Sequence, residues 1–323
     1  MFIILSNIEI MREEIITSGR LNPHIDPHLE IWHWHIPLYL FLGGLAAGIL
    51  FFASLYTILG KENKYSGAVK RAPIIVPFVL IIGLVALFFD LKHKLYFWQL
   101  YTVIRIQSPM SWGAWTLMAI TPLSMVWVAL HIKEFFPNWD WKFTIIKDIE
   151  QFLQKNKKYL AWVILYFSVI LGIYTGILFS AFNARPLWNT SILGPLFLTS
   201  GLSAGAAVII MFSKRPKERI NFAKIDIMLI GIELFLIIHM FMGFLASTQV
   251  QIDAANLFLG GPYTAPFWIF VVIIGMILPA VLEFLELRKF HIPAIIPVVL
   301  VLFGSLMLRF IISYAGQMSR WLY

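Results

Sequence analysis

Long apolar stretches alternate with short polar segments along the whole chain. A membrane-spanning helix needs about 20 mostly apolar residues. We find eight such stretches, at residues 37–59, 73–91, 112–130, 159–182, 192–212, 225–246, 265–284 and 293–313. Strands of an outer-membrane barrel would instead alternate in polarity over about ten residues. The pattern therefore predicts an all-α polytopic membrane protein with eight transmembrane helices.

Composition supports this fold class and excludes several others. Of the 323 residues, 60% are hydrophobic and only 13% are charged, whereas a soluble domain is about 25% charged. The chain has no cysteine, so it cannot form disulfides or bind an iron–sulfur cluster through thiolates. A soluble domain and a disulfide-framed protein are both excluded.

The positive charges predict how the chain is oriented in the membrane. The loops after the first, third, fifth and seventh predicted helices carry 17 Lys and Arg, and the opposite side carries 7. Loops rich in Lys and Arg stay in the cytoplasm. We therefore expect a multi-pass protein of the cell (inner) membrane with both termini in the periplasm, and we attribute the net charge of +8 to this bias, not to nucleic acid.

Glycines and prolines recur at a fixed offset, which suggests a duplication. Positions 157 residues apart match in four cases, namely Gly44 with Gly201, Gly48 with Gly205, Pro109 with Pro266 and Pro122 with Pro279. We predict a parallel duplication of a four-helix unit. The segments would be a periplasmic N-terminal segment at 1–36, a first bundle at 37–182 and a second bundle at 183–323. The alternative is that small residues and prolines are simply common in membrane helices.

Ionisable and polar residues inside a membrane are costly, so their depth indicates function. A set of them falls at the predicted outer ends or in the outer halves of helices, or within the fourth helix in the case of Tyr174, namely His33, His35, Tyr39, Asp90, His93, Arg105, Tyr174, Arg185, His239 and Arg309. We expect this set to converge on the outer leaflet. Glu233 lies about eight residues into the sixth apolar stretch, which favours a role in proton handling. Glu283 and Glu286, at the cytoplasmic end of the seventh stretch, are expected to be surface residues.

Each of these assignments has a plainer alternative. Arg185 and Arg309 would reach headgroups from helix ends. Tryptophans near the outer ends would form an interfacial aromatic belt, namely Trp32, Trp34, Trp98, Trp112, Trp115 and Trp188. The eight histidines offer no two matched pairs at one depth, so we expect no haem, and no metal-ligand spacing stands out.

Several motifs, taken in their order along the chain, resemble one family. The run NPHIDPHLEIWHWHIPLYLFLGGLAAG at residues 22–48 looks like the first helix of the NrfD/PsrC family, the membrane subunit of polysulfide reductase. The same holds for Asp90 with the following Leu-Lys, Phe97-Trp98, SPMSWG at 108–113, and NARPLW at 183–188 before LFLTSG. The resemblance covers the first five helices by motif and the last three mainly by hydropathy.

The resemblance implies an eight-helix, haemless subunit that exchanges electrons with a lipid-soluble quinone. Its partner would be an iron–sulfur protein at the periplasmic face, joined to a molybdopterin subunit or a multihaem cytochrome that acts on the terminal substrate. In relatives the pocket lies at the start of helix 1, the acid ending helix 2 and a tyrosine of helix 4, which match residues 32–39, Asp90 and Tyr174. Two positions differ: His35 stands where many relatives have an acid, and Tyr39 where the polysulfide reductase prototype has a histidine.

The function predicted is a quinone- or quinol-reacting membrane subunit of a respiratory oxidoreductase, with or without proton translocation. We assign Asp90, Tyr174 and His35 to catalysis, because a quinol must release protons and its oxygens need hydrogen-bonding partners. The residues assigned to quinone binding are Trp32, Tyr39, His93, Arg105, Trp112 and Arg185. Asp90 and Glu233 are assigned to a proton path, and no metal site is predicted.

Two other functions are compatible with the pattern. A proton-coupled secondary transporter would use the repeat, the proline-interrupted helices and Glu233, but its polar groups should gather at the midplane of the membrane and not at one face. A passive membrane anchor of a redox complex would leave Asp90 and Glu233 without a role.

Overall fold

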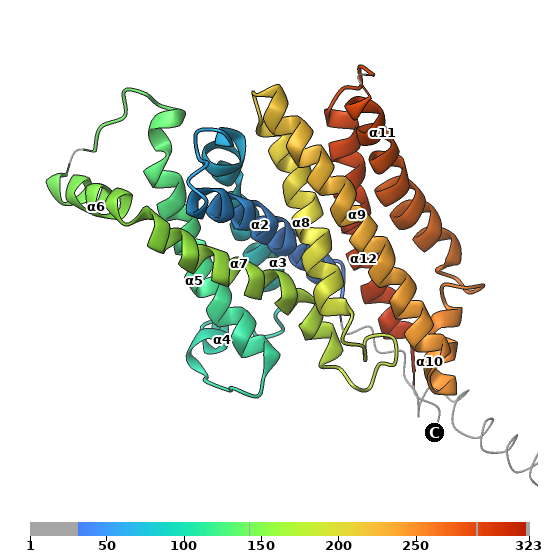
Figure 1. The fold of residues 1–323 in the computed structure, drawn as a ribbon. Coiled ribbons are helices and arrows are strands. Elements are labelled where there is room, and N and C mark those ends of the chain that lie inside the picture. The colour runs from blue at the N-terminus through green and yellow to red at the C-terminus, as the bar shows by residue number, and fades with distance from the viewer. Residues whose placement is uncertain (1–31, 142, 289, 321–323) are drawn as a thin grey trace, which may run out of the picture.

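The computed structural model describes residues 32–141, 143–288 and 290–320, all of them helical or in turns and loops. Most of the predicted segment 1–36 lies outside the described residues. Within the described part, eight helices are long and apolar enough to cross a membrane, which confirms the predicted fold class. Figure 1 shows them side by side in one bundle.

The spans follow the predicted apolar stretches closely. The first span is α2 (His35–Ile58), and the second is made of η1 (Gly67–Arg71), η2 (Ala72–Ile75) and α3 (Val76–Asp90). The third to sixth spans are α5 (Pro109–Leu130), α7 (Lys157–Ser180), α8 (Leu193–Phe212) and α9 (Pro216–Leu245). The seventh is made of η5 (Pro266–Ile277) and α11 (Leu278–Leu287), and the eighth is α12 (Ile295–Met318). The short elements between them are η3 (Lys94–Tyr96), α4 (Gln99–Thr102), η4 (Ile132–Glu134), α6 (Thr144–Lys155) and α10 (Gln249–Asn256).

The short elements distinguish the two ends of the bundle. At one end α2 begins, α3 ends, and α4 and α10 lie; we call this the α10 face (Figure 1). At the opposite end α2 ends and α6 lies; we call this the α6 face. The charge pattern predicts that the α10 face is periplasmic and the α6 face cytoplasmic.

Helix α2 is the central element, and it packs against α3, α7, α8 and α12. Its crossing with α8 is a backbone contact made by the two GxxxG motifs. A Cβ atom on Gly48 would lie 2.0 Å from the carbonyl oxygen of Gly201, and one on Gly205 would lie 2.5 Å from the carbonyl carbon of Gly48. Only residues without a side chain allow helices to approach this closely. The two motifs therefore hold residues 37–182 and 183–323 together, while the duplication itself stays a prediction.

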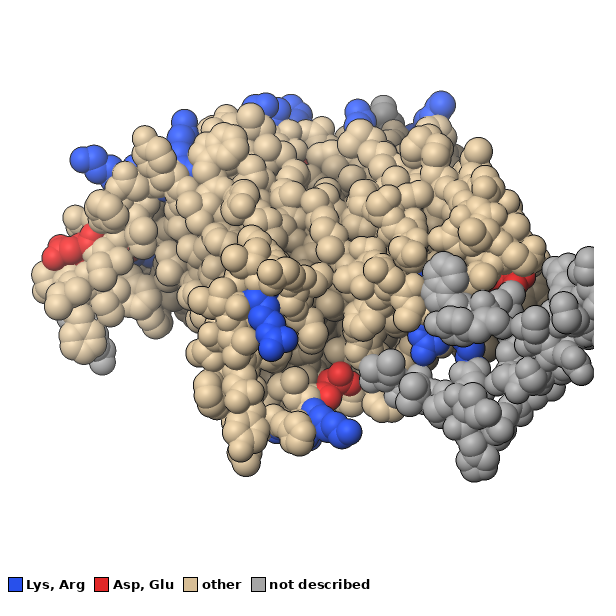
Figure 2. All heavy atoms as spheres, turned by 90° about the horizontal axis from the view of Figure 1, so that it is seen from below, with Lys and Arg blue, Asp and Glu red and all other residues tan. Residues whose placement is uncertain are grey.

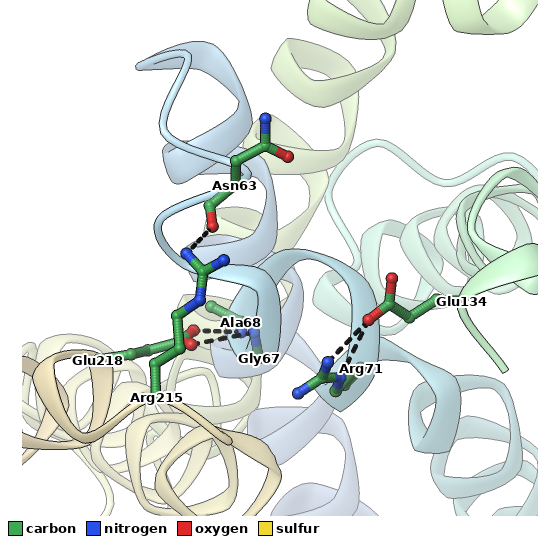
Figure 3. A network of polar contacts seen from close by, with 7 residues as sticks. All are labelled: Asn63, Gly67, Ala68, Arg71, Glu134, Arg215 and Glu218. Carbon is green, nitrogen blue, oxygen red and sulfur yellow. Dashed lines mark hydrogen bonds and ion pairs between the residues drawn. The ribbon is translucent and has the colours of Figure 1, made fainter.

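At the α6 face, a polar network joins the start of the second span to its neighbours (Figure 3). The first turn of a helix leaves N–H groups without intrahelical partners. The buried carboxylate of Glu218 accepts hydrogen bonds from two of these, the N–H groups of Gly67 at 3.2 Å and Ala68 at 3.0 Å. Arg71 pairs with Glu134 at 2.8 Å, so α9 and η4, which follows α5, are both tied to this turn.

Helix α6 was not predicted from the sequence, because it is only 12 residues long and amphipathic. It projects from the side of the bundle in Figure 1 and ends directly before the transmembrane helix α7. Ile145, Ile149 and Phe152 are exposed on it. An exposed apolar face on a helix at this depth is typical of a helix that lies in the headgroup region.

The imidazole of His131, just past the end of α5, is held in its neutral form. His131 is buried, its Nδ1 lies 2.9 Å from the carbonyl oxygen of Trp127, and its buried Nε2 has no hydrogen-bond partner. Burial, with a smaller effect of the nearby Lys157 and Lys70, lowers the pKa of His131 to about 3. In the unfolded chain this pKa would be about 6.5.

We therefore expect acid to destabilise the protein through His131. Above about pH 6.5, His131 is neutral in both the folded and the unfolded chain, and the fold has its full stability. Below this pH the free energy of unfolding falls by up to about 1.4 kcal/mol for each pH unit, because only the unfolded chain takes up the proton. Unfolding in mixed micelles at pH 7.5 and 5.5 measures the effect. His131→Asn, which keeps a donor for the Trp127 carbonyl, should lose less stability over this interval than the parent. An equal loss in both proteins would contradict the prediction.

Candidate functional site

The first part of the candidate site is a histidine–aspartate pair at the α10 face. His35 is the first residue of α2 and Asp90 is the last residue of α3. His35 Nδ1 and Asp90 Oδ1 are 3.8 Å apart, which is longer than a hydrogen bond. His35 Nδ1 is buried and has no hydrogen-bond partner, and the exposed ring of Trp34 stacks on the imidazole with centroids 4.0 Å apart. The pair is therefore a half-buried polar site in which His35 Nδ1 has unused bonding capacity.

A tyrosine cluster, formed by Tyr39, Tyr101 and Tyr174, lies behind this pair. Tyr39 is one turn after His35 on the same side of α2, and only 3% of it is exposed. The side chains of Tyr39 and Tyr174 are near enough to interact with each other, and Tyr101 is near enough to interact with Tyr39. Burial raises the pKa of Tyr101 above its ordinary value, so this phenol keeps its proton. The cluster offers hydroxyl groups that donate or accept hydrogen bonds.

Gly113 makes room for the tyrosine cluster. It belongs to the SPMSWG motif at the start of α5, and a Cβ atom there would lie 1.9 Å from Cζ and 2.3 Å from the hydroxyl oxygen of Tyr174. The phenol ring of Tyr174 therefore rests directly on the backbone of α5. The sequence shows the motif, whereas only the structure shows that its glycine contacts Tyr174 of α7.

Two hollows adjoin the site, and they share the side chains of Leu91, Phe97 and Leu100. The apolar cleft has a volume of about 260 Å³ and runs along α3; its other lining residues are Ile81, Leu84, Val85, Leu87, Phe88 and Tyr101. The loop pocket has a volume of about 510 Å³ and contains His93 and Arg105 among its lining residues. His93 and Arg105 thus come together in the α3–α5 loop, whereas the side chain that faces Asp90 is that of His35.

Trp112 anchors this loop. Its indole N–H donates to the carbonyl oxygen of Ile106 at 2.8 Å, and its ring meets Trp115 edge to face with centroids 5.8 Å apart. Trp115 in turn donates to the carbonyl oxygen of Tyr101 at 3.3 Å. Both tryptophans hold the loop that carries the loop pocket against α5.

Trp32 and Arg185 lie in a different structure, an aromatic latch at the end of α12. The rings of Trp32 and Trp188 are stacked with centroids 5.2 Å apart, and both residues are buried. The backbone of Trp32 exchanges two hydrogen bonds of 2.9 Å with the side chain of Gln317. Arg185 donates to the carbonyl oxygens of Gln317 at 2.7 Å and Ser319 at 3.1 Å. The expectation of an interfacial belt is therefore wrong for Trp32 and Trp188, which are core residues.

Glu233 lies away from these residues, among α8, α9 and α12. It is 3% exposed and interacts electrostatically with Arg309 and Asp226. Arg309 is fully buried, so the expectation that it reaches headgroups is wrong. Glu283, expected at the surface, is also fully buried, because α11 turns it toward Asp226 of α9. Sequence reasoning did not single out Asp226. Within the described residues, no group of three or more His, Asp or Glu side chains is arranged to hold a metal ion.

Known proteins of one family are similar to this chain over most of its length. The family described as "Polysulphide reductase, NrfD" matches residues 23–319. The C subunit of polysulfide reductase from Wolinella succinogenes is 31% identical over 301 residues, which cover 89% of this chain and 94% of the relative. Protein NrfD of Escherichia coli is 32% identical over 312 residues, 90% of this chain and 97% of the relative. A NrfD homologue of Haemophilus influenzae is 30% identical over 318 residues, 92% of this chain and 97% of the relative. The chain belongs to the NrfD polysulphide reductase family.

Proposed function

We propose that this chain is the quinone-reacting membrane subunit of a respiratory oxidoreductase complex. The observation that carries the proposal is the His35–Asp90 pair, with the unpartnered Nδ1 of His35, at the α10 face. Family membership supports the redox role, since one relative is a subunit of polysulfide reductase. The α10 face would be the periplasmic side of the cell membrane.

The residues fit a quinone in both shape and chemistry. A bound quinol supplies two electrons and two protons. His35 Nδ1 would hydrogen-bond a ring oxygen, and the carboxylate of Asp90, 3.8 Å away, would accept the proton from that oxygen or pass it on. The hydroxyls of Tyr39 and Tyr174 would orient the second oxygen. The apolar cleft supplies a route for an isoprenoid tail, since Ile81, Val85 and Phe88 on its lining are exposed on the outside of the bundle.

The electrons would leave to a partner at the same face, an iron–sulfur protein associated with a molybdopterin or multihaem subunit. Figure 2 views this end of the molecule, where the visible surface is mostly uncharged and the charged side chains are scattered. The α3–α5 loop exposes Leu95, Ile104 and Ile106. Exposed apolar residues next to a redox site fit a protein interface, and the loop pocket with His93 and Arg105 would lie beneath that interface.

Binding of a fluorescent hydroxyquinoline N-oxide, a quinol-site inhibitor, tests the proposal. The purified chain, with any subunits that copurify, should quench the fluorescence saturably. Asp90→Asn and Tyr174→Phe should weaken binding at least tenfold, about 1.4 kcal/mol, because each removes one polar partner while keeping the shape of the side chain.

The matched controls are Asp140→Asn and Tyr166→Phe, at exposed positions on the α6 side and on α7. Both should bind like the parent protein. Saturable binding that none of the variants changes would move the site elsewhere. A correctly folded parent preparation without saturable binding would overturn the quinone function.

A further inference from the structure

A second polar site lies inside the bundle, between α8, α9, α11 and α12. It contains three acids, Asp226 and Glu233 on α9 and Glu283 on α11, and one base, Arg309 on α12. Their exposed fractions are 0%, 3%, 0% and 0%. Because ionised groups at such positions are costly in a membrane, the site calls for a function of its own.

The polar groups form a continuous series through two serines of α8. Ser200 contacts both Arg309, at 3.2 Å, and Glu233. Ser203 contacts Glu233 and donates to Asp226 at 2.5 Å. Serine hydroxyls both donate and accept hydrogen bonds, so the series can pass a proton from one carboxyl group to the next. We call this series the acid relay: Glu283, Asp226, Ser203, Glu233 and Ser200.

At one end of the acid relay, two carboxyl groups meet, and Ser203 is the one hydroxyl that donates to them in the described structure. The side chains of Asp226 and Glu283 interact directly, while Asp226 Oδ2 and both carboxyl oxygens of Glu283 are buried without a hydrogen-bond partner. Two carboxyl groups in contact in an apolar interior cannot both be ionised. At least one of the two carboxyl groups, that of Asp226 or that of Glu283, must therefore carry a proton.

The charges of the whole site lead to the same conclusion. Arg309 is the one cation that interacts with Glu233 in the described structure, and three carboxyl groups exceed its single charge by two. Its guanidinium also donates to the carbonyl oxygens of Leu40 at 3.2 Å, Phe197 at 3.1 Å and Ser305 at 2.8 Å. Near neutrality inside the bundle requires two protons on the acids, so Arg309 is a fixed counter-charge for a site that stores protons.

The acid relay also has two distinct ends. Next to Glu283, one turn further along α11, Glu286 pairs with Arg219 at 3.5 Å, and both are partly exposed near the α6 face. At the other end, Arg309 is bonded to the carbonyl of Leu40, which directly follows Tyr39 of the tyrosine cluster. The relay thus leads from the α6 face toward the candidate quinone site.

We propose that the acid relay is a proton-binding site, and that it carries protons between the α6 face and the quinone site with Arg309 as its counter-charge. For each quinone reduced, two electrons arrive through the iron–sulfur partner and two protons arrive through the relay. In quinol oxidation both flows reverse, so electrons and protons balance. The link to quinone rests on the proposed function, whereas proton binding by the three acids does not.

Infrared spectroscopy of the parent protein, purified with the subunits that copurify, tests proton binding alone. We expect C=O bands of protonated carboxylic acids at neutral pH that shift in D₂O. Asp226→Asn, Glu233→Gln and Glu283→Gln should each reduce these bands, while the exposed control Asp148→Asn should not. If the parent lacks such bands, or if none of the three variants changes them, the relay is overturned even when quinone binding is intact.

Proton movement is then measured with the complex in sealed vesicles. Quinol is the electron donor, and a soluble electron acceptor takes the electrons from the partner subunit. Proton release per electron at the α6 face should fall at least twofold in Asp226→Asn and Glu283→Gln, because protons that still leave the quinone site must then exit at the α10 face. The parent ratio in both variants would refute the path. If the parent shows no quinol-dependent flux, the proposed function fails while the infrared result still decides whether the acids bind protons.

Discussion

Replacing Gly48 by valine should prevent the bundle from reaching its native packing. Even the first side-chain atom would lie 2.0 Å from the carbonyl oxygen of Gly201 and 3.1 Å from the Cα of Leu202. These obstacles are backbone atoms of α8, so rotation of a side chain cannot relieve the overlap and the two central helices must separate. Overpacked cores usually lose about 1–3 kcal/mol, and we expect at least the upper end of this range here.

Unfolding of the purified protein in mixed micelles measures this loss, and the amount of monodisperse protein after extraction gives a second reading. Gly231→Val is the matched control, because Gly231 is also within a long transmembrane helix but no atom lies within 4 Å of the position that a Cβ atom would take there. The prediction is wrong if Gly48→Val and Gly231→Val are equally stable.

Replacing Gly113 by alanine should remove inhibitor binding and leave the fold largely intact. The new methyl group would overlap the phenol of Tyr174, 1.9 Å from its Cζ. In contrast to the Gly48 case, the obstacle is the far end of a side chain, which can swing away. Tyr174 would then lose its contact with Tyr39, and the tyrosine cluster would lose its arrangement. We expect a decrease of at least tenfold in affinity for the hydroxyquinoline N-oxide.

Gly43→Ala is the control for this variant. Gly43 lies in α2 near the site, but its nearest neighbours would be 3.9 Å from the added methyl group, an ordinary packing distance. Gly43→Ala should therefore bind the inhibitor like the parent. Unchanged affinity in a folded Gly113→Ala protein would mean that Tyr174 is not part of the binding site.

The eight spans could be predicted from the sequence because a bilayer sets a minimum length for each apolar stretch. The residues at which the helices begin and end in polar sequence were harder to predict. The stretch predicted at 225–246 is part of α9, which begins at Pro216, since the hydropathy signal ends where charged residues such as Lys217 and Glu218 begin, although the helix continues. Helix α6 was missed for a related reason, because an amphipathic helix has no continuous apolar stretch.

The rotation of each helix about its own axis was not predictable, and it decides which polar residues meet. Glu283 is near the end of its span and looks like a surface residue, yet α11 directs it at Asp226. Arg309 has no acid near it in sequence, and its partners are carbonyls of α2, α8 and α12. His35 and Asp90 were associated by family resemblance, and only the structure gives their separation of 3.8 Å.

The aromatic latch brings the first and last described segments of the chain together. Trp32 and Gln317 are 285 positions apart, yet they exchange two hydrogen bonds. Joining two ends that already touch needs only a short linker. A circularly permuted protein, with residue 320 linked to residue 32 and new termini opened between α5 and α6, should therefore keep the same helix contacts. Pulling both ends apart would strain this latch before any other part of the bundle.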